Sequence, residues 1–409
     1  MLRTGLFWLH LVAGVVAGAV ILIMSVTGVL LTYEKQVTAW ADTRQLAPVN
    51  APLSSHLSAD SLLSLARIAK PQGTPASITF KADETRPVQV SYGKAGVLYL
   101  NPVSGAILGE GSKTVRGFFR WVTDWHRWLA GKDENRELGK QVTGAANLMF
   151  LILVLSGMVL WLPKTWTWIR FRAVLWFRSG LAGKARDFNW HNVLGIWSVI
   201  PLIAIVASAT VIGYPWASDL VYKIVGESPP PRAGAPNSAG SGGAVAAGAG
   251  SATDRRAGPD AAGAVTIDSG APASIPYAAA LATALPLVTG WKSATVQMPK
   301  PGAKTINVTL DKGTGGQPQL RATVQVAAAT GAIDKFQPFD SLTTGRQLRS
   351  VLRFTHTGEV LGLFGQTIAG LVSLASVVLV MTGIALSVRR AARALARRTT
   401  QAPAAVSAS

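Results

Sequence analysis

The sequence predicts a membrane protein of four transmembrane helices in a two-fold internal repeat, with two small α+β modules outside the bilayer. The first observation is composition: 49% of the 409 residues are hydrophobic and only 14% are charged, which is unusual for a soluble protein of this length. The second is a set of four long apolar runs, and the third is the recurrence of the same features in both halves. The chain has no cysteine, which excludes disulfides, thiolate metal sites, iron–sulfur clusters and a cysteine nucleophile.

The apolar runs cover residues 6–33, 145–162, 193–214 and 364–388. Each is close to or above the roughly 20 residues that a helix needs to cross the hydrocarbon core. The first run is too long for the core of a signal peptide and lacks a small-residue cleavage site, so we expect it to be retained as a helix.

The net charge of +19, from 39 Lys and Arg against 20 Asp and Glu, is concentrated in short segments. Residues 164–190 and 389–409 together carry eleven Lys and Arg and a single acid, Asp187. Because cytoplasmic loops are rich in Lys and Arg, both termini and the 164–190 loop are predicted to be cytoplasmic, with residues 34–144 and 215–363 outside. The excess charge is therefore a topology signal, and nucleic acid is not an expected partner.

These signals divide the chain into eight segments. They are transmembrane helix 1 (1–33), the first outside module (34–116), an amphipathic segment with transmembrane helix 2 (117–163), a basic cytoplasmic loop (164–190), transmembrane helix 3 (191–214), the second outside module (215–345), an amphipathic segment with transmembrane helix 4 (346–388) and a basic cytoplasmic tail (389–409). Within the second module, residues 229–263 are rich in Pro, Gly, Ala and Ser, which predicts a disordered insertion.

The two outside modules share one order of predicted elements. Helices are predicted at 59–69 and 275–287, and strands at 76–80, 87–92, 293–298 and 305–310. Residues 98–107 and 324–333 both alternate in polarity and end in Ser/Thr-Gly-Ala-Ile, which is typical of a strand that enters a turn. Duplication of this kind places functional sites between the two halves of a membrane protein.

Four of the five histidines recur at equivalent points of the two halves. His10 and His191 lie at the inner ends of the first and third predicted helices, and His126 and His356 lie on the outer amphipathic segments before the second and fourth. One histidine pair on each side of the membrane is the arrangement that two bis-imidazole haems require. Haem b needs only axial ligands and no covalent cysteine, so the pattern predicts two haem b groups with these four histidines as iron ligands.

Each predicted spanning helix also carries a Ser or Thr and a Gly near its far end. These are Thr27-Gly28, Ser156-Gly157, Thr210 with Gly213, and Thr382-Gly383. His10 precedes Thr27 by 17 residues and His191 precedes Thr210 by 19. We therefore expect Thr27 and Thr210 to be equivalent in the two halves.

Small and basic residues near the histidines favour haem binding. Gly14 and Gly18 share one helix face with His10 at i+4 and i+8, which leaves room for a flat macrocycle against the backbone. Four arginines near the outer histidines are candidates to pair with haem propionates or anionic chelates: Arg120, Arg127, Arg349 and Arg353.

Each of these features also has an ordinary structural explanation, which the sequence leaves open. A single histidine at a membrane boundary is as often an interfacial residue, and small residues four apart more often serve helix packing. One zinc or copper centre is excluded, because the four histidines are predicted on opposite faces of the membrane. We expect His56 to be a surface residue and Glu359 to be an interfacial charge.

Four motifs around the histidines resemble those of a known family. They are Trp-Leu-His-Leu-Val-Ala-Gly at 8–14, Asp-Trp-His-Arg-Trp-Leu-Ala-Gly at 124–131, Asn-Trp-His-Asn-Val-Leu-Gly at 189–195 and Phe-Thr-His-Thr-Gly-Glu-Val-Leu-Gly at 354–362. With them the sequence resembles the PepSY-associated transmembrane-helix family of bacterial iron-regulated inner-membrane proteins, over nearly the whole chain except 229–263 and the C-terminal tail. The outside modules resemble PepSY domains, although Asn101 replaces the Asp of their Tyr-x-Asp-Pro-x-Thr-Gly turn in the first copy and alanines replace its Asp-Pro step in the second.

The resemblance implies a multi-pass protein of the bacterial inner membrane, similar to ferric-siderophore reductases, with its modules in the periplasm. Carried over residue by residue, it implies His10 and His191 as inner haem ligands and His126 and His356 as outer ones. The implied reaction takes electrons from a cytoplasmic or quinol donor and reduces a periplasmic ferric siderophore to Fe(II). The resemblance names no catalytic residue, no particular siderophore and no oligomeric state.

Two other functions stay open from the sequence. The chain is an interaction or regulatory protein without redox activity if its PepSY-like modules act alone. It is a haem electron carrier if the haems pass electrons to a different periplasmic acceptor.

Overall fold

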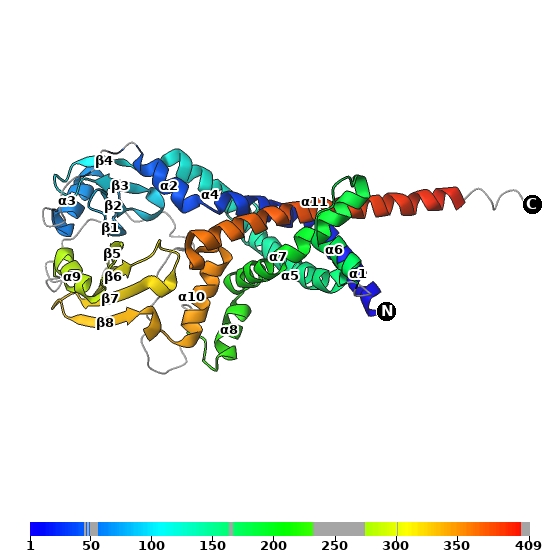
Figure 1. The fold of residues 1–409 in the computed structure, drawn as a ribbon. Helices are drawn as coiled ribbons and strands as arrows, with labels where there is room; N and C mark the ends of the chain where they lie inside the picture. The colour runs from blue at the N-terminus through cyan, green and yellow to red at the C-terminus, as the bar shows by residue number, and fades with distance from the viewer. Residues whose placement is uncertain are drawn as a thin grey trace, which may run out of the picture.

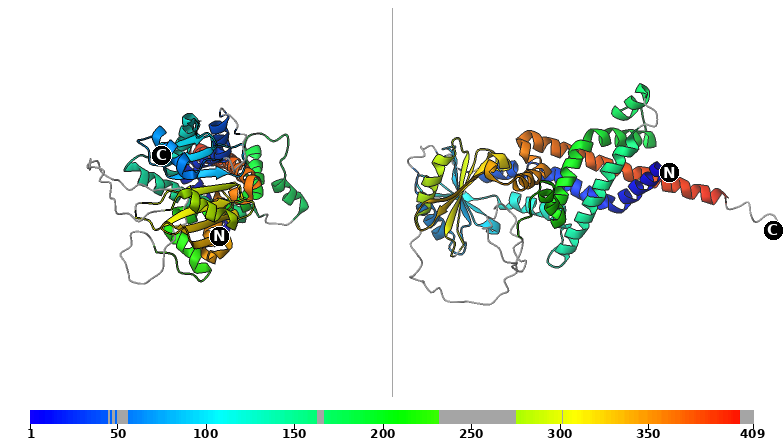
Figure 2. Two further views of the ribbon diagram at one scale, coloured as in Figure 1. Left: turned by 90° about the vertical axis from the view of Figure 1, so that its left-hand side faces the viewer. Right: turned by 90° about the horizontal axis from the view of Figure 1, so that it is seen from below.

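The computed structural model of the protein describes residues 1–44, 46, 49, 56–162, 167–231, 275–300 and 302–401. Most of the insertion predicted at 229–263 lies outside these ranges. The described part is elongated, with long helices at one end and a β-sheet at the other (Figure 1). A view from below shows the same separation of the two parts (Figure 2).

Four helices are long and apolar enough to cross a membrane, as the sequence predicted. They are α1 (Leu2–Leu31), α5 (Asn135–Trp161), α7 (Gly183–Gly213) and α11 (Gly362–Gln401). Helices α1 and α7 each pack against both α5 and α11, so α1 and α7 lie across a four-helix bundle from one another. Helix α11 continues through much of the predicted cytoplasmic tail, because Ala and Arg there are strong helix formers.

Shorter helices connect the bundle to the sheet. Helices α2 (Glu34–Thr43) and α8 (Pro215–Ile224) follow α1 and α7 toward the sheet, and α4 (Lys113–Trp128) and α10 (Thr344–His356) bring the chain back to α5 and α11. Helix α4 packs against α1 and α5, while α10 packs against α7. At the other end of the bundle, α6 (Trp168–Leu175) packs against α7.

The strands of both outside regions form one antiparallel sheet of eight strands, in the order β4-β3-β2-β1-β5-β6-β7-β8. The strands are β1 (Ser77–Lys81), β2 (Val88–Ser91), β3 (Val97–Leu100), β4 (Ile107–Glu110), β5 (Ser293–Gln297), β6 (Thr305–Asp311), β7 (Arg321–Ala327) and β8 (Ile333–Pro338). The two predicted modules are joined edge to edge where β1 pairs with β5, with Ile78 opposite Val296. This pairing satisfies two strand edges that would otherwise expose unpaired N–H and C=O groups.

Helices α3 (Ala59–Ala69) and α9 (Tyr277–Ala284) cover one face of the sheet, on the side away from the long helices (Figure 1). Alternate strand residues point toward these helices, and the resulting core runs without interruption across the β1–β5 junction. Each region thus supplies a helix followed by four consecutive strands. Helix α3 has the predicted bounds, and each predicted strand overlaps an observed one, because alternation is a local signal.

Candidate functional site: two histidine pairs

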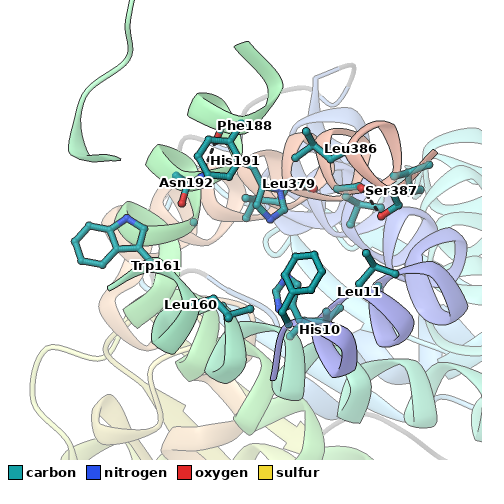
Figure 3. A pocket seen from close by; sticks show the side chains of 18 of the residues that line it. His10, Leu11, Leu160, Trp161, Phe188, His191, Asn192, Leu379, Leu386 and Ser387 are labelled. Atoms are coloured by element: carbon teal, nitrogen blue, oxygen red, sulfur yellow. Dashed lines mark hydrogen bonds between the residues drawn. The ribbon is translucent and has the colours of Figure 1, made fainter. Parts of the chain in front are cut away.

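The bundle brings His10 of α1 and His191 of α7 together at the end of the bundle where α1 begins; we call them the inner pair. Their ring centroids lie 6.3 Å apart and their ring planes are nearly perpendicular, at 86°. Both rings point into a cavity of about 1310 Å³ between the four spanning helices (Figure 3). Gly14 and Gly18 line this cavity, where the sequence predicted room for a macrocycle.

His126 of α4 and His356 of α10 meet at the sheet end of the bundle; we call them the outer pair. Their ring centroids lie 6.1 Å apart with an interplanar angle of 48°. Burial and, to a smaller extent, the neighbouring His356 lower the pKa of His126 to about 4. Burial also lowers the pKa of His356. Both imidazoles are therefore neutral near pH 7, which is the form that ligates a metal.

Glycines next to hydroxyl residues let the rings lie close against the neighbouring helices. A Cβ atom on Gly157 would lie 3.2 Å from the Cε1 atom of His10, and one on Gly383 would lie 3.4 Å from that of His191. At the outer pair, a Cβ on Gly28 would lie 3.7 Å from the Cε1 atom of His126. The recurring Ser/Thr-Gly steps thus contact histidines of a neighbouring helix.

All four paired histidines make their hydrogen bonds through Nδ1. In the inner pair, the Nδ1 atom of His10 lies 2.9 Å from Ser156 Oγ. The Nδ1 atom of His191 lies 3.0 Å from Thr382 Oγ1 and 3.1 Å from the Leu379 carbonyl. In the outer pair, the Nδ1 atom of His126 lies 2.9 Å from Thr27 Oγ1, and that of His356 lies 3.1 Å from the Ile205 carbonyl. Metal-ligating histidines commonly use one ring nitrogen in this way and bind the metal with the other.

The equivalence of Thr27 and Thr210 that the sequence predicted is wrong. The Thr210 hydroxyl lies 2.9 Å from Asn147 Nδ2, which donates to it. The contact to His356 comes instead from the turn at Ile205 and Ser208, and Ser208 follows His191 by 17 residues, the spacing from His10 to Thr27. Helix periodicity explains the error: two extra residues place a side chain on a different face.

A family model of the PepSY-associated TM region matches residues 7–390. The chain belongs to this family. The match includes both histidine pairs, all the sheet strands and almost all of the four spanning helices. No curated protein matches the chain.

Two carboxylates of this PepSY-associated protein hold the first turns of the helices that carry the outer pair. Asp42 of α2 is buried and accepts hydrogen bonds from the backbone N–H of Ser112, at 2.6 Å, and from the guanidinium of Arg116. In the second half, Glu227 accepts a hydrogen bond from the backbone N–H of Gly345 at 3.1 Å. Each acid lies more than 60 residues from its partner, so local sequence patterns gave no signal for either contact.

The four predicted arginines lie in two settings. Arg127 and Arg353 lie near each other beside the outer pair, where burial, together with neighbouring cations, lowers the pKa of both guanidinium groups. Arg120 instead donates to the Lys94 carbonyl at 3.5 Å, and Arg349 donates to Ser218 Oγ at 2.8 Å. The structure thus brings two of the four arginines together near the outer histidines.

A group of cations at the inner pair was missed from the sequence. Five exposed cations line the cavity that holds His10 and His191: Arg3, Lys184, Arg390, Arg393 and Arg397. Within the described part of the chain, no Asp or Glu lines this cavity. Four of the five lie in the basic loop and tail, whose charge was interpreted only as a topology signal.

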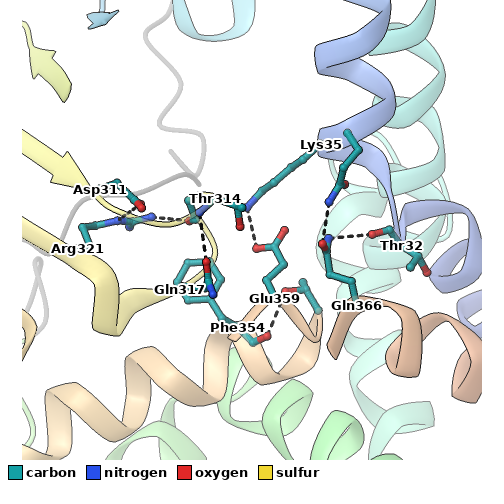
Figure 4. A network of polar contacts seen from close by, with 12 residues as sticks. Thr32, Lys35, Asp311, Thr314, Gln317, Arg321, Phe354, Glu359 and Gln366 are labelled. Carbon is teal, nitrogen blue, oxygen red and sulfur yellow. Dashed lines mark hydrogen bonds and ion pairs between the residues drawn. The ribbon is translucent and has the colours of Figure 1, made fainter. Parts of the chain in front are cut away.

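Glu359 and His56 differ from their predicted roles. Glu359 is buried and forms an ion pair with Lys35 of α2, at 2.7 Å, so it connects the two halves of the chain rather than facing an interface with lipid (Figure 4). Lys35 also lies over the ring of Phe354, two residues before His356. His56 is only partly exposed, and its Nε2 atom is buried without a hydrogen-bond partner among the described residues.

Proposed function

We propose that this protein is a haem b electron-transfer protein of the bacterial inner membrane that reduces a periplasmic ferric siderophore. The observation that carries the proposal is the ring separation within the two histidine pairs, 6.3 Å and 6.1 Å. An imidazole nitrogen lies about 2 Å from a metal that it ligates and about 1 Å from its own ring centre, so two axial imidazoles on one iron have centroids about 6 Å apart. Both pairs fit that distance without rearrangement.

The surroundings of the pairs also fit a haem. The inner cavity of about 1310 Å³ exceeds the roughly 300–1,000 Å³ of most small-molecule sites, and its walls are mainly apolar. The cations at its mouth, with Arg390 and Arg393 among them, suit the two propionates of an amphipathic dianion. Arg127 and Arg353 have the corresponding position beside the outer pair.

The chemistry supplied by bound haem is one-electron transfer. His10 with His191, and His126 with His356, would hold one haem each, near opposite faces of about 30 Å of hydrocarbon. The chain itself would bind and orient these groups. A cytoplasmic or quinol donor provides the electron, and the ferric ion of the chelate accepts it and becomes Fe(II), which hard oxygen donors hold less tightly.

We also propose the finer organisation of the chain. The shared order of a spanning helix, a helix with four strands, an amphipathic helix and a second spanning helix supports a duplicated unit with two PepSY-like modules. The basic inner segments support cytoplasmic termini and a periplasmic sheet. In that orientation Arg127 and Arg353 lie on the periplasmic side, where they would attract anionic chelates.

The test is an absorption spectrum of the detergent-purified protein, oxidised and dithionite-reduced, with a haemochrome count. We expect the spectrum of six-coordinate b-type haem at about two per chain, and loss of ferric-chelate reduction in His126→Ala and His356→Ala. A colourless protein after haem-supplemented expression would contradict the proposal and favour an interaction or regulatory role for the modules. Haem binding without reduction of any ferric chelate would favour a different periplasmic acceptor.

A further inference from the structure

The surroundings of Nδ1 are built in nearly the same way at all four paired histidines. In each case the ring meets one turn of a spanning helix that holds a Ser or Thr and the carbonyl three residues before it; three rings contact both groups, and the His356 ring contacts the carbonyl. The four turns are Thr27 with Met24, Ser156 with Leu153, Ser208 with Ile205, and Thr382 with Leu379. All four hydroxyl residues are buried.

The hydrogen-bond donors at three of these turns follow from counting protons. A hydroxyl group has a single proton to donate. Thr27 Oγ1 lies 2.6 Å from the Ile23 carbonyl, and Ser156 Oγ lies 2.6 Å from the Ile152 carbonyl. Thr382 Oγ1 makes the same contact to its own helix at 2.7 Å. Because each hydroxyl donates its proton to its own backbone, it accepts the hydrogen bond from the histidine, whose Nδ1 therefore carries the proton.

At the fourth turn, a backbone carbonyl rather than a hydroxyl accepts the hydrogen bond from the histidine. The Ile205 carbonyl lies 3.1 Å from His356 Nδ1, and Ser208 Oγ donates to that carbonyl at 2.9 Å. A carbonyl oxygen can only accept hydrogen bonds. His356 is therefore also protonated at Nδ1.

We propose that Thr27, Ser156 and Thr382, with the Ile205–Ser208 turn, are positioning residues that fix all four histidines in the Nδ1–H tautomer. This tautomer leaves the lone pair on Nε2, the nitrogen that the histidines do not use for hydrogen bonds among the described residues. A neutral imidazole binds a metal through its unprotonated nitrogen, and an acceptor at the other nitrogen increases its basicity. The identity of the metal rests on the proposed function; the tautomer is a property of the chain itself.

Buried hydroxyls elsewhere in the spanning helices provide a comparison. Ser or Thr in a membrane helix commonly donates to its own backbone without any other role. Ser376 does so, with its Oγ 2.9 Å from the Val372 carbonyl, and it is as buried as Thr382 on the same helix, α11. Ser376→Ala therefore removes a buried hydroxyl and leaves the histidine contacts in place.

The tautomer can be measured without haem, by ¹⁵N NMR of the full chain labelled at histidine and purified in the haem-free form. We expect His10, His126, His191 and His356 to give the shifts of protonated Nδ1 and unprotonated Nε2. Thr27→Val should change the His126 signals alone, Thr27→Ser should restore them, and Ser376→Ala should leave all of them unchanged. A wild-type chain with Nε2–H histidines, or Thr27→Val without effect, would overturn the proposal.

The haem-loaded protein gives a second measurement, in case Thr27→Val fails to fold. Thr382→Val and Thr382→Ser make the same comparison at His191 of the inner pair. A weaker acceptor at Nδ1 makes the ligand less basic and stabilises Fe(III) less, so Thr382→Val should raise the midpoint potential of one haem and leave the other unchanged. Unchanged potentials in a chain that binds two haems would contradict the positioning role alone, whereas Nδ1–H histidines in a chain that binds no haem would contradict the proposed function alone.

Discussion

The inner and outer histidine pairs have nearly equal ring separations, but different kinds of element hold them. His10 and His191 stand on helices of 30 and 31 residues that cross the whole bundle. His126 and His356 lie in the last turns of helices of 16 and 13 residues. A long helix is fixed by packing along its length, whereas a short amphipathic helix depends on what holds its ends. The positions of the inner histidines are therefore fixed by packing within the bundle. The positions of the outer histidines depend on contacts with the sheet and with the other half of the chain.

Asp42→Asn tests this dependence and has the largest expected effect. Asp42 has a fully buried side chain paired with Arg116 of α4, and removing one partner of a buried ion pair costs roughly 3–5 kcal/mol. The start of α4 then loses its anchor, so we expect Asp42→Asn to lose most of the outer haem and to keep the inner one. The haem count per chain, with the spectrum of the remaining haem, measures this outcome.

Asp83→Asn is the matched control for that variant. Asp83 pairs with Arg86 in a turn of the first module, where both side chains are more than half exposed, and such pairs contribute about 0–1 kcal/mol. We expect this control to retain both haems. Equal loss of the two haems in Asp42→Asn would mean that the pairs are not held independently.

The same contrast separates what the sequence predicted from what it could not. Polarity alternation predicted the strands, because this signal lies within single elements, and the recurrence of the histidines at equivalent points of the two halves predicted both pairs. The join of β1 to β5 connects residues more than 200 positions apart, and Asp42 reaches Ser112 across a whole module. No local pattern contains such contacts, because they depend on how distant elements pack. The choice of Thr210 as the equivalent of Thr27 was an intermediate case. It missed Ser208 by two residues, which is enough to select the wrong face of a helix.

Gly157→Ala and Gly28→Ala compare the two pairs at matched positions, with a smaller expected effect. An added Cβ at Gly157 would lie 3.2 Å from the His10 ring, a distance that requires the ring to move, whereas at Gly28 it would lie 3.7 Å from His126 in ordinary contact. Alanine also favours a helix interior over glycine by about 1 kcal/mol. We therefore expect Gly157→Ala to weaken haem binding at the inner pair without lowering the melting temperature, and Gly28→Ala to leave haem binding unchanged, also without lowering the melting temperature. Haem titration and thermal unfolding give the two values, and weaker binding in Gly28→Ala alone would reverse the comparison.

Removal of positive charge at the mouth of the inner cavity should have the smallest effect on haem binding, because the arginines there are exposed. The double variant Arg390→Gln, Arg393→Gln removes two of the cations that line the cavity. Exposed ion pairs contribute roughly 0.2–1 kcal/mol each, so we expect inner haem affinity to fall by about five-fold at low salt. Salt screens charges beyond about 10 Å at 0.1 M, so this difference in affinity should become smaller as ionic strength rises.

Arg172→Gln is the matched control for this double variant. It removes an exposed cation on α6, outside the residues that line the cavity, and should leave the haem affinity unchanged. An equal fall in this control would mean that net charge, rather than the position of Arg390 and Arg393, attracts the ligand.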